Sequence, residues 1–579
     1  MLYGRRFVIC GVNRLVVRVA RALTAQRAEV IVLRRGGEEE RFVRLLPAAA
    51  TVIDAGTEEE VTALQRAGLA DATCLLTLSD DDLDNLRVAV AASEVSTNVP
   101  VVLRAFDPAL ADQLEQGLNI RRAYSMSALA APAFIAAACG DEVVETLRLG
   151  DGEVPICRLT VRPDSPLVGK TTAQIKSRFG CAILARDAPN DGRVLWRPIR
   201  GEGDADGPLA EGEGVLVGGP LSDVLRLTLR NADWLREGRR RRPLRRHAGP
   251  HPHPSAPRRP TLLPYITAGL LALLVFSIAI FGRALHLRFI DALYFVVTTA
   301  TTTGYGDISL KEGPDWLKLF GCLVMLSGGA LLGILFSYLA AFATAERLDE
   351  IMGRRAGRMT DHVIVAGLGN LGYRVARLLT ELGMGVVVLE QVPNARFVEA
   401  VRARTPVLAG DARLPENAER ASVRQAVAFI ACTNDDLANI QACLHARRLS
   451  PQVATVARVF DDTLAERLTA AFAIDRALSA SQCAVSAFVG AATDERALRP
   501  LEVGDLKLIA CRYTVSGAPL APDTIAAWRA DGIRLLAFRP ASGALRSPAD
   551  LPVAALSPGD EIILCGPSGA LQTIITAVG

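Results

Sequence analysis

Two long apolar runs constrain this chain more than any other feature. Residues 262–281 and 319–345 contain no charged side chain. A bilayer core about 30 Å thick is crossed by about 20 apolar helical residues, so each run is long enough to span it. Both could instead be buried helices of a soluble core, but core helices rarely lack charge over this length. We therefore predict two membrane-spanning helices, at residues 262–282 and 317–345.

Arginines on both sides of this region predict its orientation. The cytoplasmic flanks of membrane spans carry an excess of Arg and Lys. We therefore expect a multi-pass protein of the cell (inner) membrane with both termini in the cytoplasm. The basic, proline-rich linker 233–260 either binds anionic lipid headgroups or is a disordered connection that only fixes topology. The arginines concerned are Arg239, Arg240, Arg241, Arg242, Arg245, Arg246, Arg258 and Arg259 before the first run, and Arg347, Arg354, Arg355 and Arg358 after the second.

The overall composition argues against several classes of protein. At roughly 100–200 residues per domain, 579 residues predict three to five domains. A net charge of +3 and an aromatic content of 5% argue against a nucleic-acid partner. The 11 cysteines include no CxxC pair, which argues against a zinc ribbon and a disulfide scaffold.

The segment between the two runs has a pattern that a lipid-facing loop would not tolerate. Residues 289–310 read FIDALYFVVTTATTTGYGDISL, an apolar stretch that predicts a short helix, followed by a glycine-rich strand. Non-helical backbone at membrane depth must be buried in protein or line water, because its carbonyl groups would otherwise lack partners. Alternate glycines let successive carbonyls point in one direction, and rings of such carbonyls replace the hydration shell of K⁺. We therefore predict a pore helix and an ion-selectivity filter at residues 289–307.

This segment resembles the filter of the two-transmembrane potassium channels. The match is TxxTxGYGD, placed between two spans at the family's spacing. The resemblance implies a homotetramer in which backbone carbonyls and the Thr302 hydroxyl coordinate K⁺. It also implies that Tyr305 braces the filter and that Asp307 lies at its outer mouth. The filter residues are Thr302, Thr303, Gly304, Tyr305, Gly306 and Asp307, of which the first four would supply the K⁺ ligands.

Some positions depart from the family pattern or leave alternatives open. Thr303 stands where Val or Ile is commoner, and Tyr294–Phe295 stand where many members have a Trp pair. Both changes bear on the stability and inactivation of the filter more than on its selectivity. Gly328, Gly329 and Gly333 of the second span are either the family's gating hinge or sites of close helix packing. We favour Gly328 or Gly329 as the hinge.

A βαβ unit with a glycine-rich turn follows the pore. Residues 362–391 read as strand, helix and second strand, with GLGNLG at the first turn. Such glycines let a pyrophosphate approach the backbone at a helix N-terminus, where free N–H groups and the helix dipole favour anions. An acid 23 residues after the first glycine can accept hydrogen bonds from ribose hydroxyls, and it disfavours NADP. The candidate nucleotide-binding residues are Gly367, Leu368, Gly369, Asn370, Leu371, Gly372 and the acid, Glu390.

The N-terminal part of the chain repeats this unit. FVICGVNRLVVRVARAL matches VIVAGLGNLGYRVARLL, and further blocks match in the same order. In this first copy Gly11 keeps the first glycine, whereas Asn13 and Val16 replace the other two and Arg34 replaces the acid. Larger side chains would crowd a pyrophosphate. We therefore predict that the first copy is structural and does not bind a dinucleotide.

Both copies resemble the regulator of potassium conductance, or RCK, domain. The resemblance implies a multidomain chain in which two α/β Rossmann-like RCK domains, each with a small β-rich C-terminal subdomain, flank an all-α two-transmembrane pore module. It also implies that Asp411 and Thr433 line the nucleotide crevice, with NAD(H), or else ADP or ATP, as the regulatory ligand. The predicted ranges are 1–140 and 360–482 for the RCK domains, 141–232 and 498–579 for their subdomains, 233–260 for the linker and 261–348 for the pore.

Calcium-gated members of this family bind Ca²⁺ through acidic residues on the strand that reads VATVARVFDD here. Arg458 and Phe460 stand at the matching positions, so oxygen ligands are missing there. The remaining acids are better interpreted as helix caps or solvated faces than as a metal site: Asp435, Asp436, Asp461 and Asp462.

Together these features predict a ligand-gated, potassium-selective channel and not an enzyme. Two alternatives remain, a non-conducting regulatory subunit of a potassium transporter and a membrane-anchored NAD-dependent oxidoreductase. The intact filter argues against the first. The second would need a proton-transfer residue near the nicotinamide, and the sequence pattern places none of the six histidines there.

Overall fold

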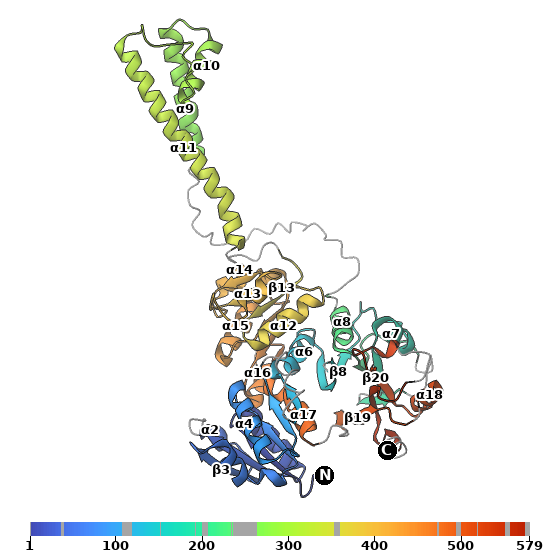
Figure 1. Ribbon diagram of the computed structural model, residues 1–579. Coiled ribbons are helices and arrows are strands. Elements are labelled where there is room, and N and C mark those ends of the chain that lie inside the picture. The colour runs from blue at the N-terminus through green and yellow to red at the C-terminus, as the bar shows by residue number, and fades with distance from the viewer. Residues whose placement is uncertain are drawn as a thin grey trace. The chain divides into compact units, whose positions relative to one another are not determined.

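Figure 1 shows the computed structural model. It describes residues 2–35, 40–106, 119–150, 152–190, 193–199, 207–232, 234, 263–351, 359–471, 474–493, 499–517, 519–550, 556–571 and 573. The predicted linker 233–260 lies outside the described residues, except for residue 234. The chain forms two compact units, which we call the α/β unit (Met1–Gly238 with Arg355–Gly579) and the helical unit (Arg239–Arg354).

The first lobe of the α/β unit is a six-stranded parallel sheet with helices on both faces. Its order is β3-β2-β1-β4-β5-β6, the doubly wound order. Successive strand residues are apolar because both faces are covered. Thus Phe7 packs toward α1, whereas Val8 packs toward α3 and α4. The strands are β1 (Arg6–Cys10), β2 (Glu29–Arg35), β3 (Ala50–Gly56), β4 (Cys74–Thr77), β5 (Val101–Arg104) and β6 (Ile120–Tyr124), and the helices are α1 (Arg14–Ala25), α2 (Glu40–Val43), α3 (Glu60–Arg66) and α4 (Asp82–Val95).

The second lobe repeats this sheet. Its order is β14-β13-β12-β15-β16-β17, again parallel. The strands are β12 (His362–Ala366), β13 (Gly385–Glu390), β14 (Val407–Ala409), β15 (Ala426–Ala431), β16 (Ala454–Arg458) and β17 (Arg476–Leu478). The helices are α12 (Asn370–Glu381), α13 (Val398–Arg402), α14 (Pro415–Arg420), α15 (Asp436–Leu449) and α16 (Asp462–Ala471).

The internal repeat extends to individual hydrogen bonds. In the first lobe the Asn85 amide accepts from Ser79 N and donates to Ser79 O and Arg104 O. In the second lobe Asn439 makes the same three bonds with Thr433 and Arg458. Each buried Asn therefore ties the ends of two neighbouring strands together, which fixes the carboxyl edge of both sheets.

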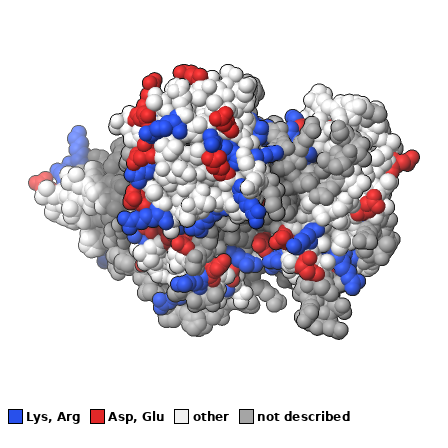
Figure 2. Space-filling model, turned by 90° about the horizontal axis from the view of Figure 1, so that it is seen from below, with Lys and Arg blue, Asp and Glu red and all other residues white. Residues whose placement is uncertain are grey.

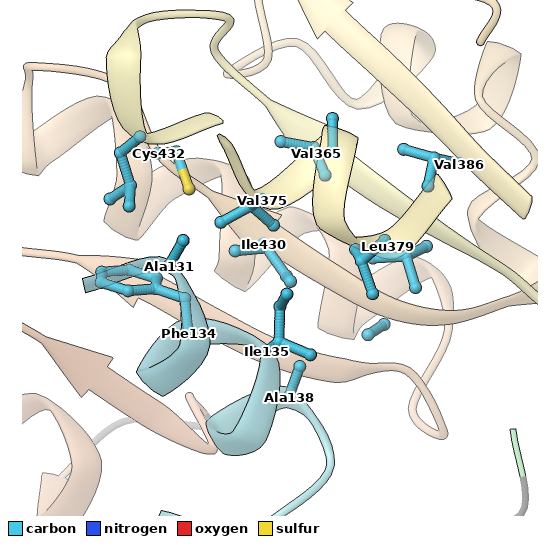
Figure 3. Packing of buried hydrophobic residues seen from close by; sticks show 14 of the residues in the cluster. Ala131, Phe134, Ile135, Ala138, Val365, Val375, Leu379, Val386, Ile430 and Cys432 are labelled. Atoms are coloured by element: carbon cyan, nitrogen blue, oxygen red, sulfur yellow. The ribbon is translucent and has the colours of Figure 1, made fainter. Parts of the chain in front are cut away.

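The two lobes exchange one helix each. Helix α6 (Met126–Ala138) follows the last strand of the first lobe but packs on α12 and the sheet of the second lobe. Figure 3 shows Phe134 and Ile135 of α6 among apolar side chains of the second lobe. Helix α17 (Ala480–Thr493) follows the second lobe and packs on α1 of the first, with Phe488 fully buried. The lobes therefore pair within one chain.

A β-rich subdomain follows each lobe. The first sheet has the order β10-β9-β11-β8-β7 and the second β18-β19-β21-β20, and all their pairings are antiparallel. The two subdomains share one apolar core. Their elements are β7 (Glu142–Leu149), β8 (Gly152–Thr160), α7 (Thr172–Phe179), β9 (Ala182–Asn190), β10 (Arg193–Pro198), β11 (Gly214–Gly218), α8 (Leu221–Asn231), β18 (Arg499–Val503), β19 (Leu506–Thr514), α18 (Pro522–Ala530), β20 (Arg534–Arg539) and β21 (Glu561–Pro567).

The described part of the helical unit consists of α9 (Leu263–Ala284), α10 (Phe289–Ala300) and α11 (Asp315–Ile351). Its core centres on Phe281, whose ring centroid lies 5.0 Å from that of Phe295. Within the described residues one helical segment, Asp315–Ser337 with a mean hydropathy of 2.3, is long and apolar enough to cross a membrane. The predicted span 317–345 lies in α11, which contains this segment. The predicted span 262–282 falls on α9, whose apolar stretch Leu271–Ala284 is shorter. The predicted fold class is confirmed.

Because each exchanged helix completes the core of the opposite lobe, shortening a buried side chain on either helix should destabilise the α/β unit. Phe134→Ala and Phe488→Ala should each lower the free energy of unfolding of the α/β unit by about 3–5 kcal/mol, because each leaves a cavity in the core of the opposite lobe. Leu83→Ala, on the exposed face of α4, is the control and should change it by less than about 0.5 kcal/mol. Chemical denaturation of the full chain measures all three. Equal effects of Phe134→Ala and Leu83→Ala would contradict the exchanged packing.

Candidate functional site

The glycine turn of the second lobe lies between β12 and α12. Gly367 has φ +89°, and a Cβ there would lie 2.9 Å from Thr433 N. A Cβ on Gly372 would overlap the carbonyl oxygen of Gly367. Gly369 is the N-cap of α12, and a Cβ on it would meet no atom within 4 Å. The turn itself therefore requires two of the three glycines, while the third leaves open space beside the helix N-terminus.

Glu390 ends β13 and is bound to this turn. Its Oε2 accepts a hydrogen bond from Leu368 N at 2.6 Å, and its Oε1 accepts one from Val392 N at 2.9 Å. Charge-assisted bonds of this kind are stronger than neutral ones. The carboxylate is therefore held at the edge of the glycine turn, half-buried, with lone pairs left for a further donor.

Asp411 and Thr433 follow β14 and β15, so the parallel order brings them to the same carboxyl edge as Glu390. The Arg413 guanidinium lies 2.6 Å from Asp411 and holds the pKa of that carboxyl below its usual range. The Thr433 hydroxyl donates to Asn439 Oδ1 at 2.7 Å. The predicted nucleotide residues therefore share one edge of the sheet, where the strand order reverses next to β12, which is where doubly wound sheets bind ligands.

The first lobe fills the equivalent space with its own side chains. The Oδ1 of Asn13 accepts from Val16 N at 3.1 Å, and its Nδ2 donates to Leu78 O at 2.6 Å. Val16 is fully buried where the second lobe has Gly372. Arg34 pairs with Glu40 at 2.6 Å and with Asp54 at 2.8 Å. The helix N-terminus that a phosphate would need is thus capped internally.

The predicted filter follows α10 in the helical unit. Thr303 N and Gly304 N both donate to Thr298 O, at 2.9 and 3.2 Å, so the chain turns sharply at the end of the helix. Gly304 has φ +53° and Gly306 has φ +78°. Tyr305 is 70% exposed and its ring stacks on Tyr294 at 6.3 Å. In a single chain the filter residues are therefore open on the side that further copies could cover.

Of the candidate hinge glycines, Gly328 has a packing function. A Cβ on Gly328 would lie 2.8 Å from Ala300 O, at the end of α10. A Cβ on Gly329 would reach Thr302 Cγ2 at 3.8 Å, and one on Gly333 would meet nothing within 4 Å. All three lie within the single helix α11. Gly328 lets α11 approach α10 closely, while a hinge at Gly328, Gly329 or Gly333 stays a prediction.

Known protein families match both the lobes and the helical unit. The model of the TrkA-N domain matches residues 7–125 and 363–480, and the model described as ion channel matches residues 266–345. The chain carries an ion-channel region between two TrkA-N domains. The resemblance seen in the sequence is thereby confirmed.

Two relatives and one solved structure are similar to parts of this chain or to its fold. An uncharacterized protein of Methanothermus fervidus is 31% identical over 214 residues, which are 35% of this chain and 33% of that protein. "Probable potassium channel protein 2" of Methanocaldococcus jannaschii is 29% identical over 180 residues, 29% of this chain and 51% of that protein. The chain thus spans at most about half the length of these relatives. The solved structure "GsuK channel bound to NAD" is 14% identical, with a TM-score of 0.49 over 99% of this chain and 79% of that one.

Other polar residues at the carboxyl edge of the second TrkA-N domain were not assigned from the sequence. Asn439 links two strand ends by hydrogen bonds. The Arg413 guanidinium forms an ion pair with the Asp411 carboxylate. Arg458 packs 4.8 Å from the Phe460 ring and donates to Asn434 Oδ1 at 2.7 Å; burial lowers its pKa. The repeat itself was the available signal, because Asn85 and Arg104 stand at the same places in the first domain.

Three of the acids beside this edge accept hydrogen bonds from backbone N–H groups, two of them at helix starts. Asp435 accepts from Ala438 N at the start of α15, Asp436 accepts from Phe460 N, and Asp461 accepts from Leu464 N. The side chain of Asp462 lies outside what the structure describes. No group of three or more His, Cys, Asp or Glu residues in the described ranges could hold a metal ion. Histidines also have local partners: the buried His362 bonds Ala421 O and His445 bonds Arg413 O, both at 2.8 Å.

The geometry of the glycine turn predicts that Gly372→Ala and Gly369→Ala differ in their effect on thermal stability. Gly372→Ala should lower the thermal midpoint of the full chain, because the new Cβ has no room beside the Gly367 carbonyl. Gly369→Ala is the matched control and should leave it unchanged within about 2 °C, since φ is −74° and the space is open. Differential scanning calorimetry separates the two. A destabilised Gly369→Ala beside an unaffected Gly372→Ala would refute this account of the turn.

Proposed function

We propose that the chain is a subunit of a homotetrameric, potassium-selective channel of the cell membrane, gated by an adenine nucleotide that binds the second TrkA-N domain. NAD(H) is the first candidate ligand, followed by ADP and ATP. The observation that carries the proposal is the open glycine turn with its tethered acid, on a chain whose ion-channel region contains a GYGD filter.

Conduction needs several copies of the filter. One strand of carbonyls cannot surround an ion, whereas four strands supply rings that replace its hydration shell. The K⁺ ligands would be the carbonyls of Thr302, Thr303, Gly304 and Tyr305. The exposed filter, together with exposed apolar side chains such as Leu319 and Leu326 on α11, supports burial against further copies and lipid.

Nucleotide binding follows from the chemistry of the crevice. The first turn of α12 has N–H groups without intrahelical acceptors, which favour a pyrophosphate, and Gly369 leaves room for it. Ribose hydroxyls could donate to Glu390, whose position is already set by Leu368 N and Val392 N. Because the Glu390 side chain is already held in place, less conformational entropy is lost when a ribose binds to it. Asp411 and Thr433 would line the same edge.

Gating requires that the ligand prefer one conformation of the assembly. A tenfold preference is worth about 1.4 kcal/mol per site, so four sites sum to about 5–6 kcal/mol, enough to move a two-state pore from mostly closed to mostly open. The connection is short in sequence: helix α11 ends at Ile351 and β12 begins at His362. A shift of the second TrkA-N domain can therefore act on α11, the helix that carries the second predicted span, through few residues.

On the face shown in Figure 2, Lys and Arg are interspersed with Asp and Glu over a largely uncharged surface. No continuous basic area appears there among the described residues. The proposed partners are the other copies of the chain and the lipid bilayer.

Selective flux is the first expected outcome. Purified protein in liposomes should pass K⁺ and Rb⁺ well above Na⁺. Gly304→Ala should abolish or derange this flux, because an L residue at φ +53° is strained and displaces the carbonyl ring. Gly269→Ala in α9 is the control and should conduct normally, since its Cβ meets only Leu331 Cδ2, at 4.0 Å. Nucleotide binding without any ion flux would favour the transporter-subunit alternative.

Nucleotide affinity is the second expected outcome. Glu390→Gln should weaken NAD(H) binding by about tenfold or more, the effect of losing a charged hydrogen-bond acceptor. Arg34→Gln at the equivalent position of the first domain is the matched control and should leave affinity unchanged. Isothermal titration calorimetry on the full chain measures both. Single-channel recording should show that Glu390→Gln shifts the nucleotide dependence of open probability but not the unitary conductance.

The same experiments separate the alternatives. An unchanged nucleotide response in Glu390→Gln would show that this crevice does not control the pore. Turnover of NADH, followed by its absorbance, would favour the oxidoreductase alternative instead.

A further inference from the structure

Asp141 is a buried titratable group that the proposed nucleotide site does not use. It follows helix α6 and is 3% exposed, and both of its carboxylate oxygens are closed off from solvent. Its N–H donates to Ala136 O at 2.9 Å, which ties it to the last turn of α6. The side chain therefore lies where the exchanged helix ends and β7 begins.

Three elements meet around this side chain, namely α6, β8 and α8. The Arg162 guanidinium donates to Cys139 O at the end of α6, and Arg162 N donates to Asn231 Oδ1 at 3.4 Å. Asn231 is the last residue of α8 and is 1% exposed; its Nδ2 donates at 2.9 Å to the carbonyl oxygen of Thr160, the last residue of β8. These polar groups hold α8 against the end of α6. We call them, together with Asp141, the α6–α8 junction.

The surroundings of Asp141 set the pH at which it titrates. Burial raises the pKa of its carboxyl from an ordinary 3.8 to about 7. The charge of Arg162 opposes this rise most, followed by the backbone of Thr160 and the side chain of Asn231, and Arg476 at the start of β17 opposes it least. Both protonation states of Asp141 are therefore populated near neutral pH.

Other titratable groups of the junction have settled charges or partners. The thiols of Cys139 and Cys157 stay neutral, because burial raises their pKa values. Glu142, the next residue in the chain, is exposed and pairs with Arg158. Among the three buried groups, Asp141 is thus the one whose charge changes near neutral pH.

The protonated form of Asp141 fits the fold better. Because folding raises the pKa, this contribution to stability is fully present below about pH 4 and is lost as the pH rises through about 7. Above that pH the junction contains a buried negative charge, which is costly. The charge also attracts Arg162 and Asn231, the groups that connect α8 to the end of α6. The junction should therefore be tighter at pH 6 than at pH 8.

We propose that Asp141 is a proton sensor that controls how firmly α8 is held at the end of α6, and that it makes the channel respond to cytoplasmic pH. Helix α8 ends at Asn231 and the next described helix, α9, begins at Leu263, so the junction lies where the chain leaves the α/β unit for the helical unit. The response of the channel rests on the proposed function, whereas the change within the junction does not. None of the predicted nucleotide residues makes the contacts described here, so protons and nucleotide would act at separate places.

Hydrogen exchange of the α8 amides, measured by mass spectrometry on the full chain in detergent, tests the junction. Asp141→Asn keeps the shape of the side chain and imitates its protonated form, and it should fold because it removes a charge that burial disfavours. Wild-type α8 should exchange as fast as that of the variant at pH 6, and at least about threefold faster at pH 8. Comparison at equal pH cancels the intrinsic pH dependence of exchange. Glu142→Gln removes the adjacent exposed carboxylate and is the matched control, which should behave as wild type at both pH values.

A second variant distinguishes titration from a merely structural effect. Arg162→Gln should move the pH midpoint of the exchange ratio upward by about one unit, because it removes the charge that most favours ionised Asp141. Loss of the contact with Cys139 O alone would speed exchange at both pH values and leave the midpoint in place. An unmoved midpoint, or a ratio of wild type to Asp141→Asn that is the same at pH 6 and pH 8, would overturn the sensor.

Single-channel recording tests the connection to the pore. The open probability of the wild type should change with cytoplasmic pH around a midpoint of about 7. Asp141→Asn should lack this step and keep the open probability that the wild type has at pH 6, while Glu142→Gln should retain the step. Equal pH dependence in wild type and Asp141→Asn would overturn the connection to the pore. The exchange ratio is measured whether or not the protein conducts, so a failure of the proposed function is distinguished from a failure of the sensor.

Discussion

The α/β unit depends on the reciprocal packing of α6 and α17. Each helix follows one TrkA-N domain in the chain and completes the core of the other. Helix α6 is apolar around its whole circumference, with no charged residue, which is typical of a helix covered on every side. Neither domain could bury its apolar helix face without the other. The pairing of the two domains is therefore a condition of folding, and every site in this unit is built on it.

Under the proposed function, duplication of one scaffold has separated stability from ligand binding. Both domains keep the buried Asn that joins their strand ends. In the second domain, glycines leave the N-terminus of α12 open, whereas in the first Asn13 caps α1 and Val16 fills the turn. A side chain that satisfies the helix N-terminus removes the anion site without weakening the helix, because N-caps stabilise helices by about 1 kcal/mol. The first domain can thus lose a ligand and remain a stable partner.

The sequence predicts those features that depend on local spacing. The glycine turn, its acid, the internal repeat and the GYGD segment follow from residues close together in the chain, and the family comparisons confirm the domains that carry them. The exchange of α6 and α17 could not be predicted, because an alanine-rich apolar helix packs equally well on either sheet. The pairing of Arg413 with Asp411 depends on the direction of their side chains, and the contact of Gly328 with Ala300 depends on how closely two helices approach. Neither can be read from the spacing of residues in the sequence.

Under the proposed function, α12 connects ligand binding to the pairing of the domains. Its N-terminus faces the open glycine turn, while Val375 and Leu379 further along pack against α6. A phosphate bound at the first turn would pull on a helix whose other residues form the interface with the first domain, and close-packed interfaces shift between discrete arrangements because they cannot deform continuously.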